Sequence, residues 1–302
     1  MENTIKANSL PKQENLPKMK KPQHGQEHTV QSNKTYYWLS VAVLVVITIL
    51  FIFPLYWIIT GSFKTPQAIN ARVPVWFPAE FVTVHYAKLF ERPAFLWLWN
   101  TVLICGASMG LTCVTAAMGG YALAKKKFFG RAFIFSMFVC AMALPKQVIL
   151  IPLLKEMAFL KLHNTLWAVI LPTVGWPFGV FLMKQFSENI PGELLEAARI
   201  DGAGETRTFL SIVLPMIKPG IGALAIFTFI TAWNDYFLQL IMLNDTRVLS
   251  ISLGIAKLQS ELSTDYGLIM AGAALGSIPI IAIFLMFQKF FTRGITMGAV
   301  KG

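Results

Sequence analysis

Six long apolar runs decide what this chain can fold into. A helix needs ~20 residues, at a rise of ~1.5 Å per residue, to cross the ~30 Å hydrocarbon layer of a membrane. Each run meets or nearly meets that length, and the first is too long for the core of a signal peptide. We therefore predict an all-α, polytopic membrane protein with six transmembrane helices. The expected spans cover about residues 36–60, 96–123, 132–153, 165–183, 220–243 and 266–287.

The charge content supports a membrane environment. Only 14% of the 302 residues are charged and the mean hydropathy is +0.59, whereas soluble domains carry about 25% charged residues. The net charge of +11 would favour nucleic-acid binding in a soluble protein. Here the basic residues lie between apolar runs, so orientation in a lipid bilayer explains them better. We expect no nucleic-acid partner.

Lysine and arginine positions predict how the chain is oriented, because cytoplasmic loops carry an excess of both residues. If the spans alternate, the basic N-terminal tail, the Lys125–Lys127 cluster, the loop with Arg199 and Arg207, and the C-terminal segment share one side. This predicts that both termini are cytoplasmic (N-in, C-in). Residues 1–35 have few large apolar side chains and are expected to form a disordered basic tail. Residues 36–302 are the expected transmembrane domain.

Two further patterns predict local structure. The external connection of about residues 61–95 is rich in aromatic side chains and proline, which is unusual for a disordered loop. We expect a short packed cap there, partly helical around Val84–Phe90. Prolines such as Pro145, Pro172 and Pro177 lie within or near the ends of spans and predict kinks, since neighbouring helices can satisfy the freed carbonyls.

The internal connection of residues 190–219 carries the clearest functional pattern. Pro191 and Glu193 suit a helix start, through the preset φ of proline and a carboxylate near the positive helix end. Leu194, Leu195 and Ala198 fall on one face of the short helix that follows. The pattern predicts a helix–turn–helix on the cytoplasmic surface. It fits a helix that docks in a groove of a partner protein, and it also fits one that rests on lipid headgroups.

The same loop resembles the EAA loop of ABC importer permeases. Its string EAARIDGAGETRTFLSIVLPMIKPG contains Glu-Ala-Ala, a glycine four residues later and a distal Leu-Pro. The wider chain, about residues 36–302, is similar to the maltose-type carbohydrate permeases. Residues that carry the two resemblances are Glu196, Ala197, Ala198, Gly202, Leu214 and Pro215 in the loop, and Asn100-Thr101, Tyr121–Ala124, Ile151-Pro152 and Gly294–Gly302 elsewhere.

This resemblance implies a permease subunit that moves a carbohydrate, of di- or oligosaccharide size, by alternating access across a bacterial plasma membrane. The implied partners are a second, non-identical permease, a cytoplasmic ABC ATPase dimer and an extracellular or periplasmic sugar-binding protein. Residues 196–204, with Asp201 and Gly204 among them, would form a coupling helix on the ATPase, and Val300, Lys301 and Gly302 would reach between the ATPase subunits. ATP and Mg²⁺ would be used by the ATPase.

The sequence gives no sign of catalysis by this chain. It contains no GxxxxGK[ST] phosphate loop, no GxSxG elbow and no HExxH. Its three cysteines lack the CxxC spacing of metal sites, and His24 and His28 have no third ligand nearby. We expect no catalytic residue, no metal and no cofactor bound by this chain.

Two polar groups inside apolar runs are candidates for a substrate path, because such groups are costly in membranes. They are Lys146-Gln147 in the third run and Trp233-Asn234-Asp235-Tyr236 in the fifth. Counted along continuous helices, Lys146 and Asp235 lie at similar heights, ~21–23 Å from the cytoplasmic ends. They could contact a sugar, with Trp233 and Tyr236 as aromatic faces, or they could form an ion pair that joins two helices.

Other functions remain open at the level of sequence. Related permeases move amino sugars, polyols or glycerol phosphates. An ion-coupled secondary transporter would tend to show inverted repeats and intramembrane carboxylates, but no clear repeat is present and Asp235 is the one acidic residue well inside a span. In a structural scaffold the EAA string would be a coincidence.

Overall fold

A computed structural model of the chain describes residues 34–261 and 265–299. The described residues form helices and no β-strand, which confirms the all-α prediction. The predicted tail falls almost wholly outside the described residues, and so do Val300, Lys301 and Gly302. The helices are α1 (Lys34–Gly61), α2 (Pro66–Ile69), α3 (Val84–Phe90), α4 (Ala94–Lys125), α5 (Arg131–Met142), α6 (Lys146–Phe159), α7 (Trp167–Val174), α8 (Phe178–Glu188), α9 (Gly192–Ile200), α10 (Glu205–Thr208), a π-helical turn η1 (Phe209–Val213), α11 (Leu214–Met216), α12 (Lys218–Asn234), α13 (Tyr236–Met242), α14 (Ile251–Glu261) and α15 (Tyr266–Ala299).

Four stretches in the described part of the chain are long and apolar enough to cross a membrane: Tyr36–Gly61, Ala94–Lys125, Trp167–Glu188 and Tyr266–Gln288. Two further candidates are bent pairs, Arg131–Met142 with Lys146–Phe159 and Glu205–Met216 with Lys218–Asn234. The number reaches the predicted six when each bent pair counts as one span.

The third apolar run differs from the continuous helix expected over residues 132–153. Its two halves, α5 and α6, meet at an angle of 108°. Pro145 between them has ψ 131°, an extended conformation. Proline disfavours the helical conformation of the residue before it and donates no N–H, so the chain turns there and α6 begins afresh at Lys146.

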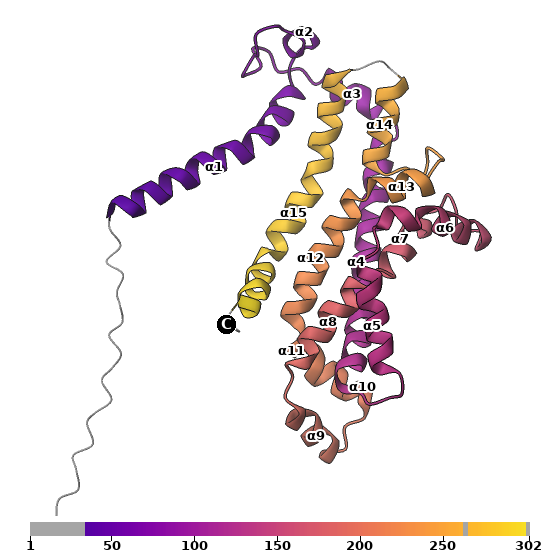
Figure 1. Cartoon of the computed structure of the whole chain (residues 1–302). Coiled ribbons are helices and arrows are strands. Elements are labelled where there is room, and N and C mark those ends of the chain that lie inside the picture. The colour runs from indigo at the N-terminus through magenta and orange to yellow at the C-terminus, as the bar shows by residue number, and fades with distance from the viewer. Residues whose placement is uncertain (1–33, 262–264, 300–302) are drawn as a thin grey trace, which may run out of the picture. The chain divides into compact units, whose positions relative to one another are not determined.

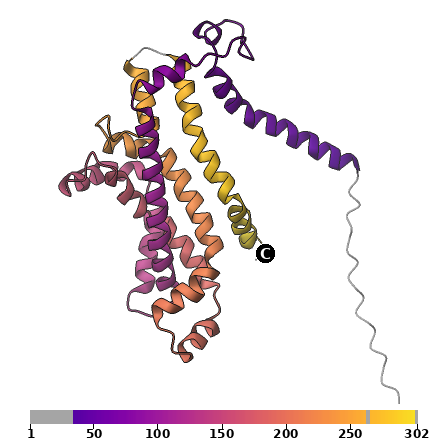
Figure 2. The same ribbon diagram turned by 180° about the vertical axis from the view of Figure 1, so that it is seen from behind.

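The chain divides into two compact units, residues 1–52 and 53–302. Within the second unit, α4 packs along α8 and α12, and α12 packs along α15. Gly120 of α4 allows a close approach, because a Cβ there would lie 2.6 Å from the backbone of Met183 and Lys184 in α8. Helices α3 and α14 lie at one end of this unit and α9 lies at the opposite end (Figures 1 and 2).

The predicted cap is a packed aromatic cluster. The helix expected around Val84–Phe90 is α3. Tyr56 donates its hydroxyl to the Trp76 carbonyl at 2.7 Å, and the rings of Trp57 and Trp76 meet edge to face at 6.0 Å. The buried Lys64 ammonium lies 3.9 Å from the centroid of the Trp57 ring. Aromatic packing orders this connection, as its composition predicted.

Candidate functional site

The short helix α9 occupies the centre of the 190–219 loop and has defined ends. Pro191 precedes it in an extended conformation (ψ 134°), and Glu193 lies in its first turn. After Ile200 the chain reverses at Gly202, whose φ is +74°. The Ala203 N–H donates to the Ala198 carbonyl at 2.9 Å and the Gly202 N–H to Arg199 at 3.0 Å, which is the Schellman pattern of helix ends. A side chain at Gly202 would be strained at this φ.

Helix α9 has two apolar faces, whereas the sequence predicted one. Ala198 is buried and Leu195 is half-buried, and Leu195 packs against the hydrophobic cluster that contains Ile190, Val213 and Ile217. Leu194 is 42% exposed and does not belong to that cluster. Together with Ala197 and Ile200 it forms a second face at i, i+3, i+6 spacing.

This second face is unusual for a short surface helix. Ile200 is 87% exposed, and Ala197 and Glu196 are exposed too. Singly exposed apolar residues are common, but three in helical register, one of them the small Ala197, form a surface suited to another protein. The i, i+3, i+6 spacing of Leu194, Ala197 and Ile200 was visible in the sequence and could have identified it.

The return path from α9 contains a π-helical turn. The Leu214 N–H bonds the Phe209 carbonyl, five residues earlier. Pro215 follows directly and has no N–H to donate to the carbonyl four residues before it. The helical segment Glu205–Met216, which contains this turn, meets α12 at 75°. The Leu214-Pro215 pair therefore lies where the loop turns into the next span.

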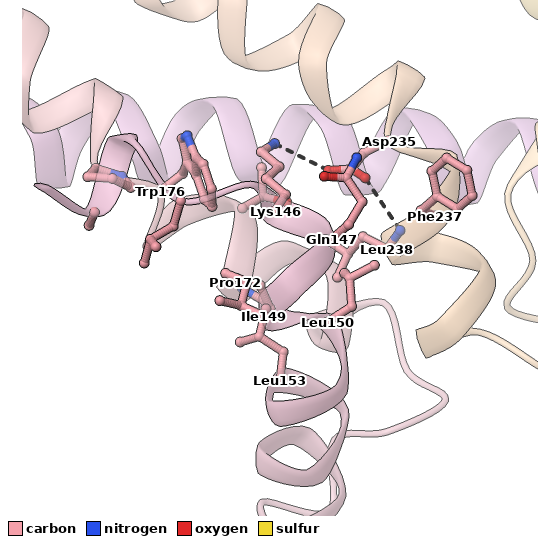
Figure 3. A pocket seen from close by; sticks show the side chains of 15 residues that line it. Lys146, Gln147, Ile149, Leu150, Leu153, Pro172, Trp176, Asp235, Phe237 and Leu238 are labelled. Atoms are coloured by element: carbon pink, nitrogen blue, oxygen red, sulfur yellow. Dashed lines mark hydrogen bonds and ion pairs between the residues drawn. The ribbon is translucent and has the colours of Figure 1, made fainter.

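A second candidate region is a cavity of about 320 Å³ at the junction of three helix breaks. It lies where α5 turns into α6, α7 into α8 and α12 into α13, as the lining residues show (Figure 3). Most of the lining is apolar, including Leu144, Ile149, Leu150 and Phe237. Polar groups enter at Lys146, Gln147, Thr173, Trp176 and Asp235.

An ion pair and an aromatic ring form the polar side of the cavity. Lys146 Nζ lies 3.3 Å from Asp235 Oδ2 and 4.8 Å from the centroid of the Trp176 ring (Figure 3). The second Asp235 oxygen accepts the Leu238 N–H at 3.4 Å and caps α13. Both charged side chains are partly shielded, at 32% and 16% exposure. The cavity thus has apolar walls, a neutralised charge pair and an indole face.

The structure brings together only part of the predicted substrate-path set. Lys146, Gln147 and Asp235 line the cavity, whereas Trp233, Asn234 and Tyr236 are not among its lining residues. Trp233 is buried and stacks on Phe229 at 5.7 Å. The Asn234 amide donates to the Ile230 carbonyl of its own helix. At the break between α12 and α13, Asp235 therefore lines the cavity while the residues on either side of it do not.

Sequence reasoning missed Trp176, the aromatic residue that does line the cavity. It stands between Gly175 and Pro177, and it lies outside both α7 and α8. An aromatic residue placed between glycine and proline inside an apolar run is a usable signal, because the break frees its side chain from helix packing. Among the described residues, no group of three or more His, Cys, Asp and Glu side chains could hold a metal ion.

The sequence matches a family of transport proteins. Residues 115–297, which include the cavity and the whole 190–219 loop, match the family described as "Binding-protein-dependent transport system inner membrane component". The chain belongs to this family. It is a membrane-embedded, multi-pass permease, and the relatives below are named as permeases too.

The arabinooligosaccharide transport system permease protein AraQ of Halalkalibacterium halodurans is 32% identical over 88% of this chain and 96% of that protein. The maltodextrin transport system permease protein MdxG of Bacillus subtilis is 31% identical over 86% and 94%. A solved chain of a bacterial ABC transporter involved in alginate import aligns with a TM-score of 0.75 at 19% identity, over 86% of this chain and 98% of that one. This last likeness shows the fold.

Proposed function

We propose that this permease moves a carbohydrate of di- or oligosaccharide size through an ATP-driven ABC importer, by alternating access in a bacterial plasma membrane. The full-length similarity to permeases named for arabinooligosaccharides and maltodextrin carries this proposal. Its partners would be a second, non-identical permease, a cytoplasmic ATPase dimer that uses ATP and Mg²⁺, and an external sugar-binding protein. The family description, with its dependence on a binding protein, supports the last of these.

The outward face of α9 is the proposed contact with the ATPase. Leu194, Ala197 and Ile200 supply an apolar stripe, and the adjacent Glu196 supplies a charge. A short amphipathic helix that fits a groove is a common mode of recognition. Because α9 and α3 lie at opposite ends of the second unit (Figure 1), this assignment makes the α9 end cytoplasmic and the α3 end external. That agrees with the N-in, C-in orientation predicted from charge.

The cavity at the three helix breaks is the proposed part of the substrate path. Irregular backbone inside a membrane protein is tolerated where it lines a cavity, and transporters place solute sites at such breaks. The Trp176 ring offers a face for a sugar ring, and Gln147 and the Lys146–Asp235 pair offer hydrogen bonds. The alternative is that the pair only joins α6 to the α12–α13 junction.

Two measurements test the transport proposal. Membrane vesicles loaded with ATP but with a collapsed ion gradient should accumulate sugar, because an ABC importer needs no ion gradient. Loss of uptake under this condition would favour an ion-coupled transporter. Glu196→Lys should abolish coupled uptake while the chain stays in the membrane. The control, Glu91→Lys, makes the same charge change at the α3 end and should leave ATPase binding intact. Normal uptake by Glu196→Lys would refute the docking assignment.

A charge exchange tests the cavity. If Lys146 and Asp235 only join two helices, the double variant Lys146→Asp with Asp235→Lys should regain the uptake that either single variant loses. If they contact the sugar, the double variant should stay impaired. Trp176→Leu should raise the sugar concentration needed for half-maximal uptake, and Trp167→Leu, a control at a residue that is 49% exposed and outside the cavity, should not.

A second class of solute has one specific observation in its favour. The sulfoquinovosyl glycerol transport system permease protein SmoH of Agrobacterium fabrum is 30% identical over 83% of this chain and 89% of that protein. A modified sugar linked to a polyol is therefore a candidate. Binding assays on the cognate binding protein with neutral oligosaccharides and with this solute class would separate the two.

A further inference from the structure

Two consecutive lysines at the end of α4 contact both ends of the loop that holds α9. Lys125 Nζ donates to the Glu188 carbonyl at 3.1 Å and to the Ile190 carbonyl at 2.6 Å. Both carbonyls lie where the chain leaves α8 and enters the loop. The Lys125 ammonium group therefore holds the first segment of the loop, where the chain leaves α8, against the last residue of α4.

The neighbouring lysine, Lys126, holds the segment of the loop that follows α9. Lys126 Nζ forms an ion pair with Glu205, the first residue of α10, where the chain has just left α9. The same ammonium lies 5.0 Å from the centroid of the Tyr121 ring, one turn back in α4. Arg199 of α9 also contacts the Glu205 carboxylate, at 3.6 Å. Glu205 thus links the end of α4 to α9 itself.

Packing beneath the charges connects the same elements. The ring of Tyr121 lies 5.6 Å from the ring of Phe209, in the π-helical turn of the return path. Hydrogen bonding from Lys126 lowers the pKa of Glu205 below its ordinary value, so this carboxylate is charged at neutral pH. Helix α4 in turn packs along α7, which lines the cavity, and along α8 and α12, which begin and end directly beside lining residues Pro177 and Asp235.

We propose that Lys125 and Lys126 are positioning residues that fasten both ends of the coupling loop to α4, so that movement of α9 is passed to this helix and from it to the substrate path. This inference rests on the proposed docking of α9 to the ATPase. Without the two lysines, α9 would still bind the ATPase through its outward face. The loop would then shift on its own, and ATP would be hydrolysed with less solute moved.

ATP can favour one transporter state only through contacts that differ between states. A loop fastened at one end can pivot, whereas a loop fastened at both ends to one helix must move that helix with it. Exposed ion pairs contribute little to stability on their own, so the expected loss lies in coupling and leaves folding almost unchanged.

The test uses the complete transporter in proteoliposomes, with this chain, its partner permease, the ATPase dimer and the binding protein loaded with transported sugar. The readout is sugar moved per ATP hydrolysed, together with retention of the ATPase on purification. Lys126→Glu and Glu205→Lys should each lower that ratio roughly fivefold, the low end of measured coupling factors, while the ATPase stays bound. The double exchange should recover at least part of the loss, limited by Arg199 beside the new lysine.

Neighbouring residues provide matched controls. Lys127→Glu makes the same charge change at the next residue, which is exposed and has no contact to the loop among the described residues, and it should keep the wild-type ratio. Lys125→Met should lower the ratio, whereas Lys125→Arg, which still donates to carbonyls, should retain most of it. Wild-type ratios in Lys126→Glu and Lys125→Met, or a double exchange no better than the single variants, would overturn the inference.

The two proposals fail in different ways. If the wild-type assembly shows no ATP-driven uptake, or if Glu196→Lys transports normally, the proposed function fails and the inference fails with it. If the wild type transports and Glu196→Lys loses uptake, but the lysine variants keep the wild-type ratio, only the role of Lys125 and Lys126 is refuted.

Discussion

The close approach of α4 to α8 at Gly120 predicts a large effect from a single methyl group. In Gly120→Ala the new Cβ would lie 2.6 Å from the Lys184 nitrogen, the Met183 carbonyl carbon and the Met183 Cβ. Ordinary contacts of this kind are 3.4–4 Å. Two of the three atoms are backbone, so no rotamer change can relieve the overlap and α8 must shift by nearly 1 Å. Overpacking of this kind costs about 1–3 kcal/mol.

The neighbouring residue supplies the control. In Gly119→Ala the nearest atoms belong to the Val180 side chain at 3.7 Å, which is ordinary contact. Replacing a glycine inside a helix also removes about 0.5–1 kcal/mol of unfavourable backbone entropy. Gly119→Ala should therefore be neutral or slightly stabilising. Because both substitutions gain this backbone term, the two variants should differ by the overpacking cost alone, about 1–3 kcal/mol.

Thermal unfolding of the detergent-purified chain measures this difference. A change of 1 kcal/mol shifts the Tm by about 2–4 °C in domains of roughly 150–250 residues. We expect Gly120→Ala to melt about 2–12 °C below Gly119→Ala, and we expect less of the Gly120→Ala protein than of the Gly119→Ala protein in the membrane. Equal melting temperatures would show that α4 and α8 do not approach this closely, and the packing described for the second unit would be wrong.

Three further predictions concern polar contacts. Asn100→Leu removes two hydrogen bonds to loop carbonyls, at 2.9 and 3.0 Å, and should lower the free energy of unfolding by about 2 kcal/mol. The control, Asn70→Ala at an exposed residue, should change the free energy of unfolding by about 0.5 kcal/mol or less. Trp97→Phe loses the 2.8 Å hydrogen bond from the indole to a loop carbonyl and should cost about 1–2 kcal/mol in the same melting assay. Because Lys126 lowers the pKa of Glu205, their ion pair is fully formed above the ordinary glutamate pKa and is lost only as pH falls through the lowered value. Sugar moved per ATP should therefore be constant from about pH 6 to about pH 8, and a midpoint inside that window would contradict the assigned pair.

The helical class and the location of the apolar stretches could be predicted from sequence, because long apolar runs leave a chain few alternatives in a membrane. The breaks could be predicted only as kinks. Pro145 identifies where α5 ends, but the 108° angle depends on what α6 packs against. The break at Asp235 has no proline at all. This break depends on the Asp235 side chain, which caps α13. The chain could instead have continued the helical hydrogen bonds of α12, and the sequence alone does not decide between the two.

The Lys146–Asp235 pair was predicted for a reason that is only partly correct. Counting along continuous helices placed both residues at similar heights. In the structure Lys146 begins a new helix after the Pro145 turn, and Asp235 stands between two helices. They meet because both lie at breaks. The same breaks decide which aromatic residue lines the cavity, since Trp233 belongs to the packed face of α12 and Trp176 lies at a break beside the cavity.

On α9 the sequence predicted the helix and its glycine stop, but placed Leu194 on the same face as Leu195 and Ala198. A period of 3.6 residues puts Leu194, Leu195 and Ala198 within one broad stripe. Only the position of the neighbouring core shows which part of that stripe is covered. Leu194 lies just outside it, and the outward stripe of Leu194, Ala197 and Ile200 follows.

The π-helical turn at Phe209–Val213 has a consequence for the lengths that this loop can tolerate. A π-helical turn holds one residue more than the α-helix around it. Deleting one residue there would restore regular α-helical bonding with little change of phase, because the wider turn already absorbs the extra residue. Adding or removing a residue in the regular helix beside it would instead rotate everything on one side by about 100°, and the outward face of α9 would turn away from its present direction while the Glu196–Gly204 string stayed unchanged. The phase between that string and the next span is thus as much a part of the site as the residues themselves.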